Sequence, residues 1–149
     1  MDVVIRLASL DDASALLNVE NQCFVTDKIP RRQMRYLLSK GKTRVWLAEY
    51  QGNVLGYALM FVPKHPRPAR LYSLAVLAES RGLQIGNKLL NAALSDVKQL
   101  GYDKAVLEVR NSHHVVQQLY RKFGFSPVKT IEDYYQDGEA ALKMAANLD

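Results

Sequence analysis

The sequence predicts an α/β fold with one mixed sheet of about six or seven strands and helices on both of its faces. Three observations support this fold class. The chain of 149 residues is long enough to bury one sizeable core. Strand-like and helix-like patterns follow one another in the order β-α-α-β-β-β-α-β-α-β-β. No repeat, low-complexity segment or long linker divides the chain, so residues 1–149 are expected to form a single domain.

The first third of the chain predicts one strand and two helices. Residues 3–8, VVIRLA, alternate enough for a short strand. The next segment has a capping residue, Ser9 or Asp11, followed by a face at helical spacing. That face consists of Ala13, Leu16, Leu17, Glu20 and Phe24. A second helix begins at Pro30 and ends at Gly41, because proline suits a helix start and glycine a helix end.

Three strands follow in the middle of the sequence. Residues 43–50 and 53–62 are rich in β-branched and aromatic side chains, and the QGN between them predicts a hairpin. KHPRPAR at 64–70 contains two prolines and predicts an exposed loop. LYSLAV at 71–76 then predicts a fourth strand.

The C-terminal half predicts two helices and three strands. NKLLNAALSDVKQLG at 87–101 has one apolar helical face and ends at a glycine. That face consists of Leu89, Leu90, Ala93, Val97 and Leu100. KAVLEVR at 104–110 predicts a strand, and HHVVQQLYRKFG at 113–124 predicts a helix that again ends at a glycine. Residues 125–146 are expected to form two strands around the turn QDGE.

Composition narrows the class of protein. The 48% of hydrophobic and 23% of charged residues are ordinary for a soluble globular chain, and no apolar run reaches the roughly 18 residues of a membrane span. The first residues lack the features of a signal peptide, so we expect a cytoplasmic protein with no membrane partner. The single cysteine, Cys23, excludes an intrachain disulfide and a CxxC site, and we expect no metal.

The net charge of +5 favours anionic ligands without naming one. Basic residues cluster at 31–35 and 64–70, where solvated surface charge is the simpler interpretation. No aromatic-interleaved basic strip appears of the kind that binds single-stranded nucleic acid. We therefore expect no nucleic-acid partner, and we keep nucleic-acid association as an alternative suggested by charge alone.

Two glycines stand where a predicted strand leads into a predicted helix. In ESRGLQIGNKLL, residues 79–90, Gly82 and Gly86 follow Arg81 and lie close to the helix start. The first backbone N–H groups of a helix lack intrahelical partners, and glycines let a pyrophosphate approach them closely. A plain turn is the alternative for this segment alone.

The same segment resembles a known signature. RGLQIGNKLL is similar to the R/Q-x-x-G-x-G/A motif of the GCN5-related N-acetyltransferase (GNAT) superfamily, with Gln84 in place of the first glycine. LEVRNSHHVVQQLYRKFGF at 107–125 resembles LEVR-x-SN-x-A-x-x-LY-x-x-x-GF of the RimI-type branch, the ribosomal protein alanine acetyltransferases, which acetylate protein N-termini. Residues 20–24 and 134–144 are also similar to that branch. The resemblance covers nearly the whole chain and implies a mostly antiparallel sheet with four helices.

The resemblance implies acetyl-CoA as cosubstrate. The turn after the fourth strand would hold its pyrophosphate, and the main chain of that strand would pair with its pantetheine arm. His113 occupies the place of a cofactor-contacting asparagine. The implied cofactor-binding residues are Leu74, Ala75, Val76, Arg81, Gly82, Leu83, Gln84, Ile85, Gly86, Asn87 and His113.

The resemblance also implies two catalytic residues and two that hold the acceptor. Glu108 matches the general base, acting directly or through water, and a salt bridge with a neighbouring arginine is its alternative role. Tyr120 matches the general acid that stabilises the leaving thiolate, and packing on a buried helix face is its alternative. Tyr134 and Tyr135, expected in a strand, match the peptide-binding cleft, although packing explains them equally well.

The chemistry favours a protein α-amine as acceptor. An α-amine has a pKa near 8 and a lysine amine one near 10.4, so the α-amine is the free base roughly two hundred times more often at neutral pH. Ala140 stands where the branch often has an aspartate, which weakens the assignment of the acceptor.

Two alternatives in function and one open question on assembly accompany this reading. The chain could acetylate a small amine such as a polyamine, an amino acid or an antibiotic, because one fold serves many acceptors. It could also bind coenzyme A without catalysis, although retention of Glu108 and Tyr120 argues against that. Both monomer and homodimer fit the sequence, and an exposed edge strand in the tail could support a dimer.

Overall fold

A computed structural model describes residues 2–81 and 84–149 of the chain. Within these residues the strands and helices follow the predicted order, with two additional 3₁₀ turns at Leu10–Asp12 and Ala78–Ser80. The strands are β1 (Val4–Leu7), β2 (Thr43–Tyr50), β3 (Asn53–Phe61), β4 (Ala69–Val76), β5 (Lys104–Arg110), β6 (Ser126–Ile131) and β7 (Ala141–Asn147). The α-helices are α1 (Ala13–Cys23), α2 (Arg31–Ser39), α3 (Ile85–Gln99) and α4 (His114–Lys122).

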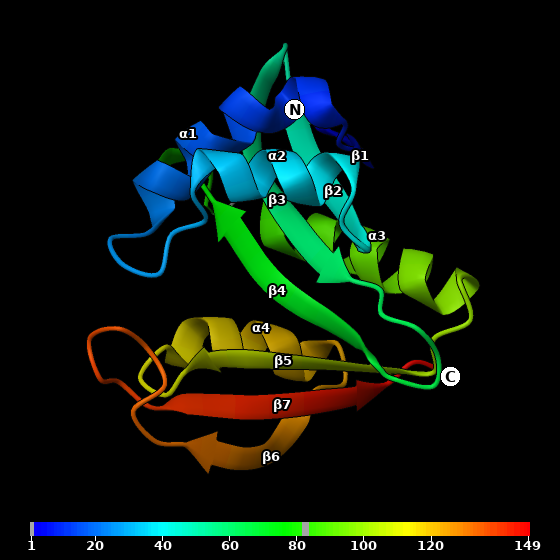
Figure 1. The fold of residues 1–149 in the computed structure, drawn as a ribbon, viewed down its shortest axis with the longest axis vertical. Coiled ribbons are helices and arrows are strands. Elements are labelled where there is room, and N and C mark those ends of the chain that lie inside the picture. Colours follow the sequence, from blue (N-terminus) through cyan, green and yellow to red (C-terminus); the bar gives the residue numbers. More distant parts are fainter. Residues whose placement is uncertain (1, 82–83) are drawn as a thin grey trace.

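All seven strands form one sheet in the order β1-β2-β3-β4-β5-β7-β6. β4 and β5 pair in parallel, and the other neighbouring strands pair antiparallel, as the expected mixed sheet requires. The parallel pairing is short, because it joins only Ala69–Leu71 to Ala105–Leu107. Beyond these residues the two strands diverge, which Figure 1 shows as a wedge in the middle of the sheet.

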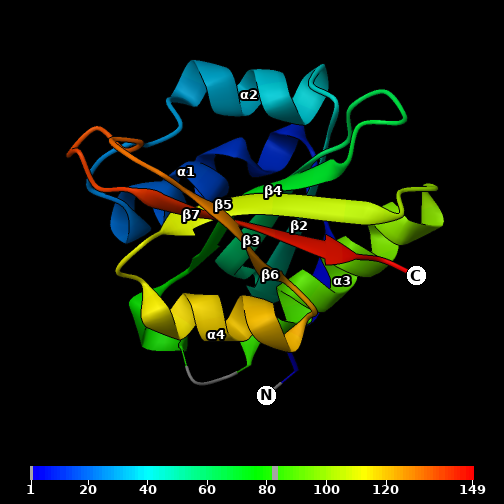
Figure 2. The ribbon, with the colours of Figure 1, turned by 90° about the horizontal axis from the view of Figure 1, so that it is seen from below.

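The helices cover both faces of the sheet. α1 and α2 lie on one face, and α3 and α4 lie on the other (Figure 2). Under α1 and α2, Leu16 and Met34 pack in a buried cluster with Tyr57 of β3. Under α3 and α4, a larger cluster includes Leu90 and Leu107 and extends across both halves of the sheet.

Local turn chemistry follows the sequence closely at one hairpin. Gln51 and Gly52 join β2 to β3, and both have positive φ, 51° and 82°. Two successive residues with positive φ make the type I′ turn that matches the twist of paired strands. The hairpin predicted from QGN is therefore confirmed.

The tail differs from the prediction in one respect. β6 and β7 do form, but residues 132–140 between them make a nine-residue loop rather than a tight turn at QDGE. The loop contains Asp133 and Gly138 with positive φ, 52° and 88°. Within residues 2–81 and 84–149, none of the helices combines the length and the apolar composition that a membrane span requires.

Candidate active site

A pocket of about 360 Å³ opens where β4 and β5 diverge. Its walls come from these two strands, from α4, from the α1–α2 loop (residues 24–30) and from the β6–β7 loop (residues 132–140). The residues that line it include Arg70, Glu108, His113, Tyr120, Tyr134 and Tyr135. Both predicted catalytic residues and both predicted acceptor-binding residues therefore line one pocket.

Glu108 lies on the pocket side of β5. Its neighbours Leu107 and Val109 are buried on the opposite side, as the alternation of a strand predicts. The Glu108 side chain is 11% exposed. Its Oε1 accepts a hydrogen bond from Arg70 Nε at 2.8 Å and lies 2.7 Å from Arg70 Nη2 in an ion pair. The salt bridge with an arginine, which was the alternative role expected for Glu108, is thus present and is made with Arg70. Both contacts use Oε1, and Oε2 accepts no hydrogen bond from Arg70.

Tyr120 lies on α4 with only 7% of its surface exposed. Burial raises the pKa of its phenol well above the ordinary value, so the hydroxyl stays protonated at neutral pH. Its ring packs edge-on against Phe125, with ring centroids 5.9 Å apart. The residue therefore combines core packing with a side chain that lines the pocket.

Tyr134 and Tyr135 lie in the β6–β7 loop, so the expectation of a strand position is wrong for both. The β6–β7 ladder ends at the pair Ile131–Ala141, and the chain then leaves the sheet. The two rings pack edge-on at 4.9 Å, and the Tyr134 hydroxyl accepts a hydrogen bond from Arg70 at 3.1 Å. Burial, with the nearby Tyr134, raises the pKa of Tyr135 to about 12.

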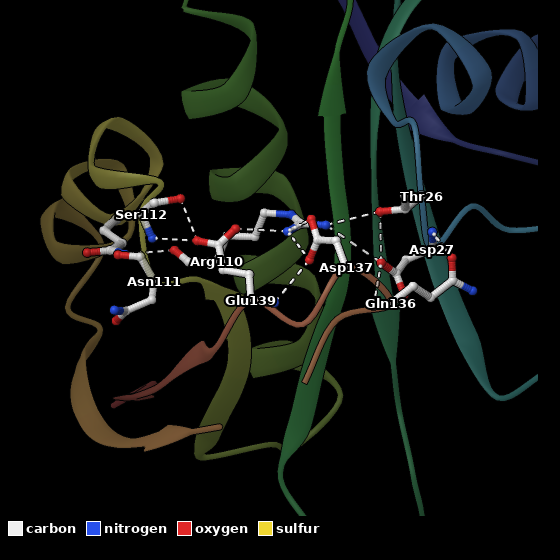
Figure 3. Close-up of polar contacts among 9 residues, drawn as sticks. Thr26, Asp27, Arg110, Asn111, Ser112, Gln136, Asp137 and Glu139 are labelled. Carbon is white, nitrogen blue, oxygen red and sulfur yellow. Dashed lines mark hydrogen bonds and ion pairs between the residues drawn. The ribbon is translucent and has the colours of Figure 1, made fainter. Parts of the chain in front are cut away.

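Arg110, at the end of β5, connects the two loops that form the pocket walls (Figure 3). Its Nη1 lies 2.9 Å from Asp137 Oδ2 and 2.8 Å from Glu139 Oε1, both in the β6–β7 loop. Its Nη2 donates to Thr26 Oγ1 at 3.1 Å and lies 3.6 Å from Asp27 Oδ2, both in the α1–α2 loop. One side chain thus joins segments that are far apart in sequence.

Further hydrogen bonds tie these loops together. The Asp27 N–H donates to Gln136 Oε1 at 3.2 Å, and the Gln136 N–H donates to Asp27 Oδ2 at 3.3 Å. The Ser112 N–H donates to Glu139 Oε2 at 2.9 Å. Hydrogen bonds from Ser112 and Arg110 lower the pKa of Glu139 to about 2. Sequence reasoning missed this network, because no local spacing relates residues 27, 110 and 137.

Glu20 is a second feature that sequence reasoning did not assign to the site. It is 2% exposed and lines the pocket from α1. Its Oε2 accepts the Ile29 N–H at 2.8 Å, and its Oε1 accepts the hydroxyl of Tyr57. Burial and the Glu20 carboxylate raise the pKa of Tyr57. Glu20 thereby anchors the α1–α2 loop to β3, and its place on an otherwise apolar helical face was the available signal.

The predicted cofactor-binding residues of β4 lie next to the divergence. Leu74, Ala75 and Val76 extend past the last pairing with β5, and Leu74 lines the pocket. The Val76 carbonyl already accepts a hydrogen bond from Arg81 Nε at 3.2 Å. His113 lines the same pocket, and burial together with the Arg81 charge lowers its pKa.

The predicted pyrophosphate turn is described in part. Gly82 and Leu83 lie outside the described residues, while Ile85, Gly86 and Asn87 form the first turn of α3. Gln84 precedes α3 with φ 61° and ψ 24°, the left-handed conformation. A Cβ built on Gly86 would meet only the Leu119 side chain of α4, at 3.4 Å, which is an ordinary van der Waals contact.

No group of three or more metal-ligating side chains comes together in residues 2–81 and 84–149. The site thus consists of a half-buried carboxylate and a buried phenol at a break in a sheet, beside the start of a helix. Such a set suits proton transfer to and from a bound substrate.

Known proteins define the class to which this fold and site belong. Residues 11–125 match the profile of the Acetyltransferase (GNAT) family. An N-alpha-acetyltransferase of Sulfolobus acidocaldarius is 31% identical over 155 aligned positions, which cover 97% of this chain and 92% of that protein. The chain therefore belongs to the acetyltransferase (GNAT) family. It is an acetyl-CoA-dependent N-acetyltransferase.

Two solved structures show the same fold. The ribosomal-protein-S18-alanine N-acetyltransferase from Escherichia coli superposes with a TM-score of 0.89 at 21% identity, covering 99% of this chain and 95% of that one. A chain of the NatC complex bound to Gag peptide and CoA superposes with a TM-score of 0.85 at 20% identity and covers both chains completely. The resemblance to the RimI-type branch is confirmed by a relative in sequence, the putative ribosomal protein bS18-alanine N-acetyltransferase of Bacillus subtilis, which is 29% identical over 94% of this chain and 92% of that protein.

Proposed function

We propose that this enzyme acetylates the α-amine of protein N-termini. The observation that carries the proposal is that Glu108 and Tyr120 line one pocket at the divergence of β4 and β5. The similarity to an N-alpha-acetyltransferase over 97% of the chain supports this choice of acceptor. The free-base fraction of an α-amine at neutral pH supports it too, because a larger share of the acceptor is then uncharged before it reaches Glu108.

In the proposed reaction the amine nitrogen attacks the thioester carbonyl of acetyl-CoA. A C–N bond forms, the C–S bond breaks, and the electron pair of that bond leaves with sulfur. Glu108 accepts the proton that the amine loses, directly or through one water. Arg70 binds Oε1 and so orients the carboxylate, while Oε2 is the proposed acceptor of the proton.

Tyr120 is the proposed partner of the leaving thiolate. A phenol with a raised pKa does not give up its proton fully to a thiolate whose conjugate thiol has an ordinary pKa near 8.5. Its hydroxyl instead stabilises the developing charge by a hydrogen bond, and proton transfer is completed as coenzyme A leaves. The main chain of Leu74–Val76 and the turn from Arg81 to Asn87, with His113, are the proposed contacts of the cosubstrate.

The test measures acetyl transfer to synthetic peptides by mass spectrometry and thiol release. We expect peptides with a free N-terminus to be acetylated and the same peptides with a formylated N-terminus to be inert. Glu108→Gln and Tyr120→Phe should each lower kcat about 10²–10⁴-fold. Both variants should remain folded, as judged by Tm, because neither substitution empties a volume in the core.

Tyr36→Phe provides the matched control, because this substitution also removes a tyrosine hydroxyl, but outside the pocket. Tyr36 lies on α2 and is 56% exposed. It should keep full activity. Unchanged turnover in Tyr120→Phe would remove the assigned acid. Acetylation of polyamines or amino acids, with no acetylation of any peptide, would replace the protein acceptor by a small one.

A further inference from the structure

A second pocket, of about 290 Å³, adjoins the first. It is lined by the end of β3, the β3–β4 loop, the residue before β2, and one residue each of β4 and β5. Its lining residues are Lys42, Phe61, Pro63, Arg67, Pro68, Arg70 and Val106. Arg70 lines both pockets, and the same side chain forms an ion pair with Glu108.

The second pocket is basic. Lys42, Arg67 and Arg70 line it, and no acidic side chain does. The charge of Arg70 is balanced by Glu108. Among the described residues, by contrast, Lys42 and Arg67 have no carboxylate within salt-bridge distance. Two cations therefore face this pocket without a charged partner in the chain.

A strip of aromatic and cationic side chains connects the two pockets. Tyr134, in the first pocket, accepts a hydrogen bond from Arg70, whose guanidinium lies 5.5 Å over the ring of Tyr72. Tyr72 packs edge-on against Phe61 of the second pocket, with centroids 5.0 Å apart. Tyr72 is 38% exposed, so this strip presents a surface to a ligand that passes between the pockets.

We propose that the second pocket is a subsite for an acidic side chain of the acceptor polypeptide, downstream of the residue whose amine is acetylated. The inference rests on the proposed function, because only a polypeptide acceptor has downstream residues. An extended chain advances about 3.3–3.6 Å per residue, so the side chains next after the first are those that can pass Arg70 and reach Lys42 and Arg67.

The chemistry of the pocket selects a carboxylate. Arg67 can bind it in a bidentate manner, while Lys42 supplies a second positive charge. Phe61 and Val106 provide an apolar floor for the methylene groups of a glutamate. Arg67, in the basic segment 64–70 that the sequence alone predicts to carry solvated surface charge, thus becomes a determinant of acceptor choice.

The experiment compares peptides that differ at one position. Each set keeps the same first residue and carries Glu, Gln or Lys at the second, third or fourth position. We expect Glu to exceed Gln in kcat/KM by about five- to tenfold at one of these positions at low ionic strength, with Lys the poorest. The preference should decline in high salt, because exposed ion pairs are screened.

The double variant Lys42→Gln/Arg67→Gln should bring the Glu-to-Gln ratio close to one. The matched control is Lys98→Gln/Lys122→Gln, which removes two exposed charges from α3 and α4 on the other face of the sheet. This control should keep the ratio of the unaltered enzyme.

The outcomes separate the two proposals. Acetylation of peptides without an acid preference, or a preference that survives the Lys42/Arg67 double variant, would overturn the subsite and leave the proposed function intact. Failure to acetylate any peptide would overturn both, because the subsite has no meaning without a polypeptide acceptor.

Discussion

Gln84 holds a backbone conformation that suits glycine better than glutamine. Its φ of 61° and ψ of 24° lie in the left-handed region, directly before α3. A side chain there costs roughly 1–2 kcal/mol, because its Cβ crowds the following carbonyl. The R/Q-x-x-G-x-G/A signature has glycine at this position, and the observed conformation gives the physical reason.

Replacing Gln84 by glycine is expected to relieve this strain. The gain exceeds the extra chain entropy of glycine, about 0.5–1 kcal/mol, so Gln84→Gly should raise the free energy of unfolding by up to about 1 kcal/mol. It should also raise the affinity for acetyl-CoA if the turn holds the pyrophosphate, and calorimetric titration measures that affinity. Denaturant unfolding supplies the stability value.

Gln51→Gly is the control for this prediction. Gln51 has φ 51° in the β2–β3 turn, away from the pocket, so its replacement relieves similar strain at a distance. It should change stability in the same direction and leave acetyl-CoA affinity unaltered. Equal gains in affinity from both variants would show that the effect is global and has no connection with the turn.

At the scale of single residues, the sequence predicted the catalytic side chains but not the side chain that binds Glu108. Glu108 and Tyr120 were identified by resemblance, and both line the pocket. Arg70, which binds Glu108 at 2.7 Å, was not identified as the partner. Its position opposite Val106 depends on the register of a parallel pairing, which no local pattern specifies.

At the scale of elements, the α1–α2 and β6–β7 loops behave as one unit through Arg110. Three carboxylates, from Asp27, Asp137 and Glu139, surround this guanidinium within 3.6 Å. Its Cζ also lies 4.2 Å over the ring centre of Tyr135. Loss of the positive charge would leave like charges facing one another and release both walls of the pocket (Figure 3).

Arg110→Ala is therefore expected to raise KM for a peptide acceptor about tenfold, because the hydrogen bonds to charged groups that hold the loops are lost. KM for acetyl-CoA should change less than twofold. Arg110→Lys should recover only part of the effect, since an ammonium cannot reproduce the planar fork of contacts. Steady-state kinetics with each substrate varied in turn provide the measurement.

Arg44→Ala is the matched control, because Arg44 also makes a two-pronged ion pair, with Asp96 on α3. It should lower stability and leave both KM values close to those of the unaltered enzyme. A parallel rise of both KM values in Arg110→Ala would contradict a role confined to the acceptor loops.

The elements themselves followed from periodicity, but the long loop after β6 did not. Tyr134 and Tyr135 are strong strand formers, and local preference placed them in a strand. The structure uses them instead as pocket walls, where Arg70 and Arg110 contact them. Contacts with these arginines thus outweigh the strand propensity of the two tyrosines in the loop that lines the pocket.

For the whole molecule, ion pairs that join separate elements set the response to acid. Asp96 is partly desolvated, which raises its pKa, but hydrogen bonds from Arg44 and Trp46 outweigh this and lower the pKa below the ordinary 3.8. Arg6 lowers the pKa of Asp12 in the same way, between β1 and the Leu10–Asp12 turn. Carboxylates with lowered pKa values stabilise the fold above about pH 4, and this contribution is lost as pH falls through their folded-state values.

Asp96→Asn is expected to lower the free energy of unfolding by about 1 kcal/mol at pH 7, since the amide keeps part of the hydrogen bonding and loses the charge. The difference from the unaltered protein should begin to shrink below about pH 4, where the unfolded-state carboxylate becomes protonated, and should shrink further as pH falls through the lowered pKa of the folded state. Urea unfolding at a series of pH values measures both.

Asp103→Asn, at an exposed position, is the control and should leave the dependence of stability on pH unchanged. A difference between Asp96→Asn and the unaltered protein that stays constant at every pH would contradict the role assigned to the Asp96 charge.

The order of the strands along the sheet could not be predicted from the hydrophobic pattern of the sequence. Hydrophobic alternation shows that β5, β6 and β7 exist, yet it does not determine which of them is central. The pairing of β5 with β7 brings Glu108 opposite Lys143. Such pairings depend on the packing of the completed sheet against α3 and α4.

The interior position of β7 has a consequence for biosynthesis. β5 and β6 flank β7 on its two sides, yet both are made before it. During translation the earlier strands can pair as they leave the ribosome. The edges of β5 and β6 that pair with β7 keep unpaired backbone groups until residues 141–147 have been made. The nascent enzyme should therefore stay incompetent for catalysis until its seventh strand emerges, and a ribosome stalled before that point would display an unfinished, aggregation-prone half-sheet.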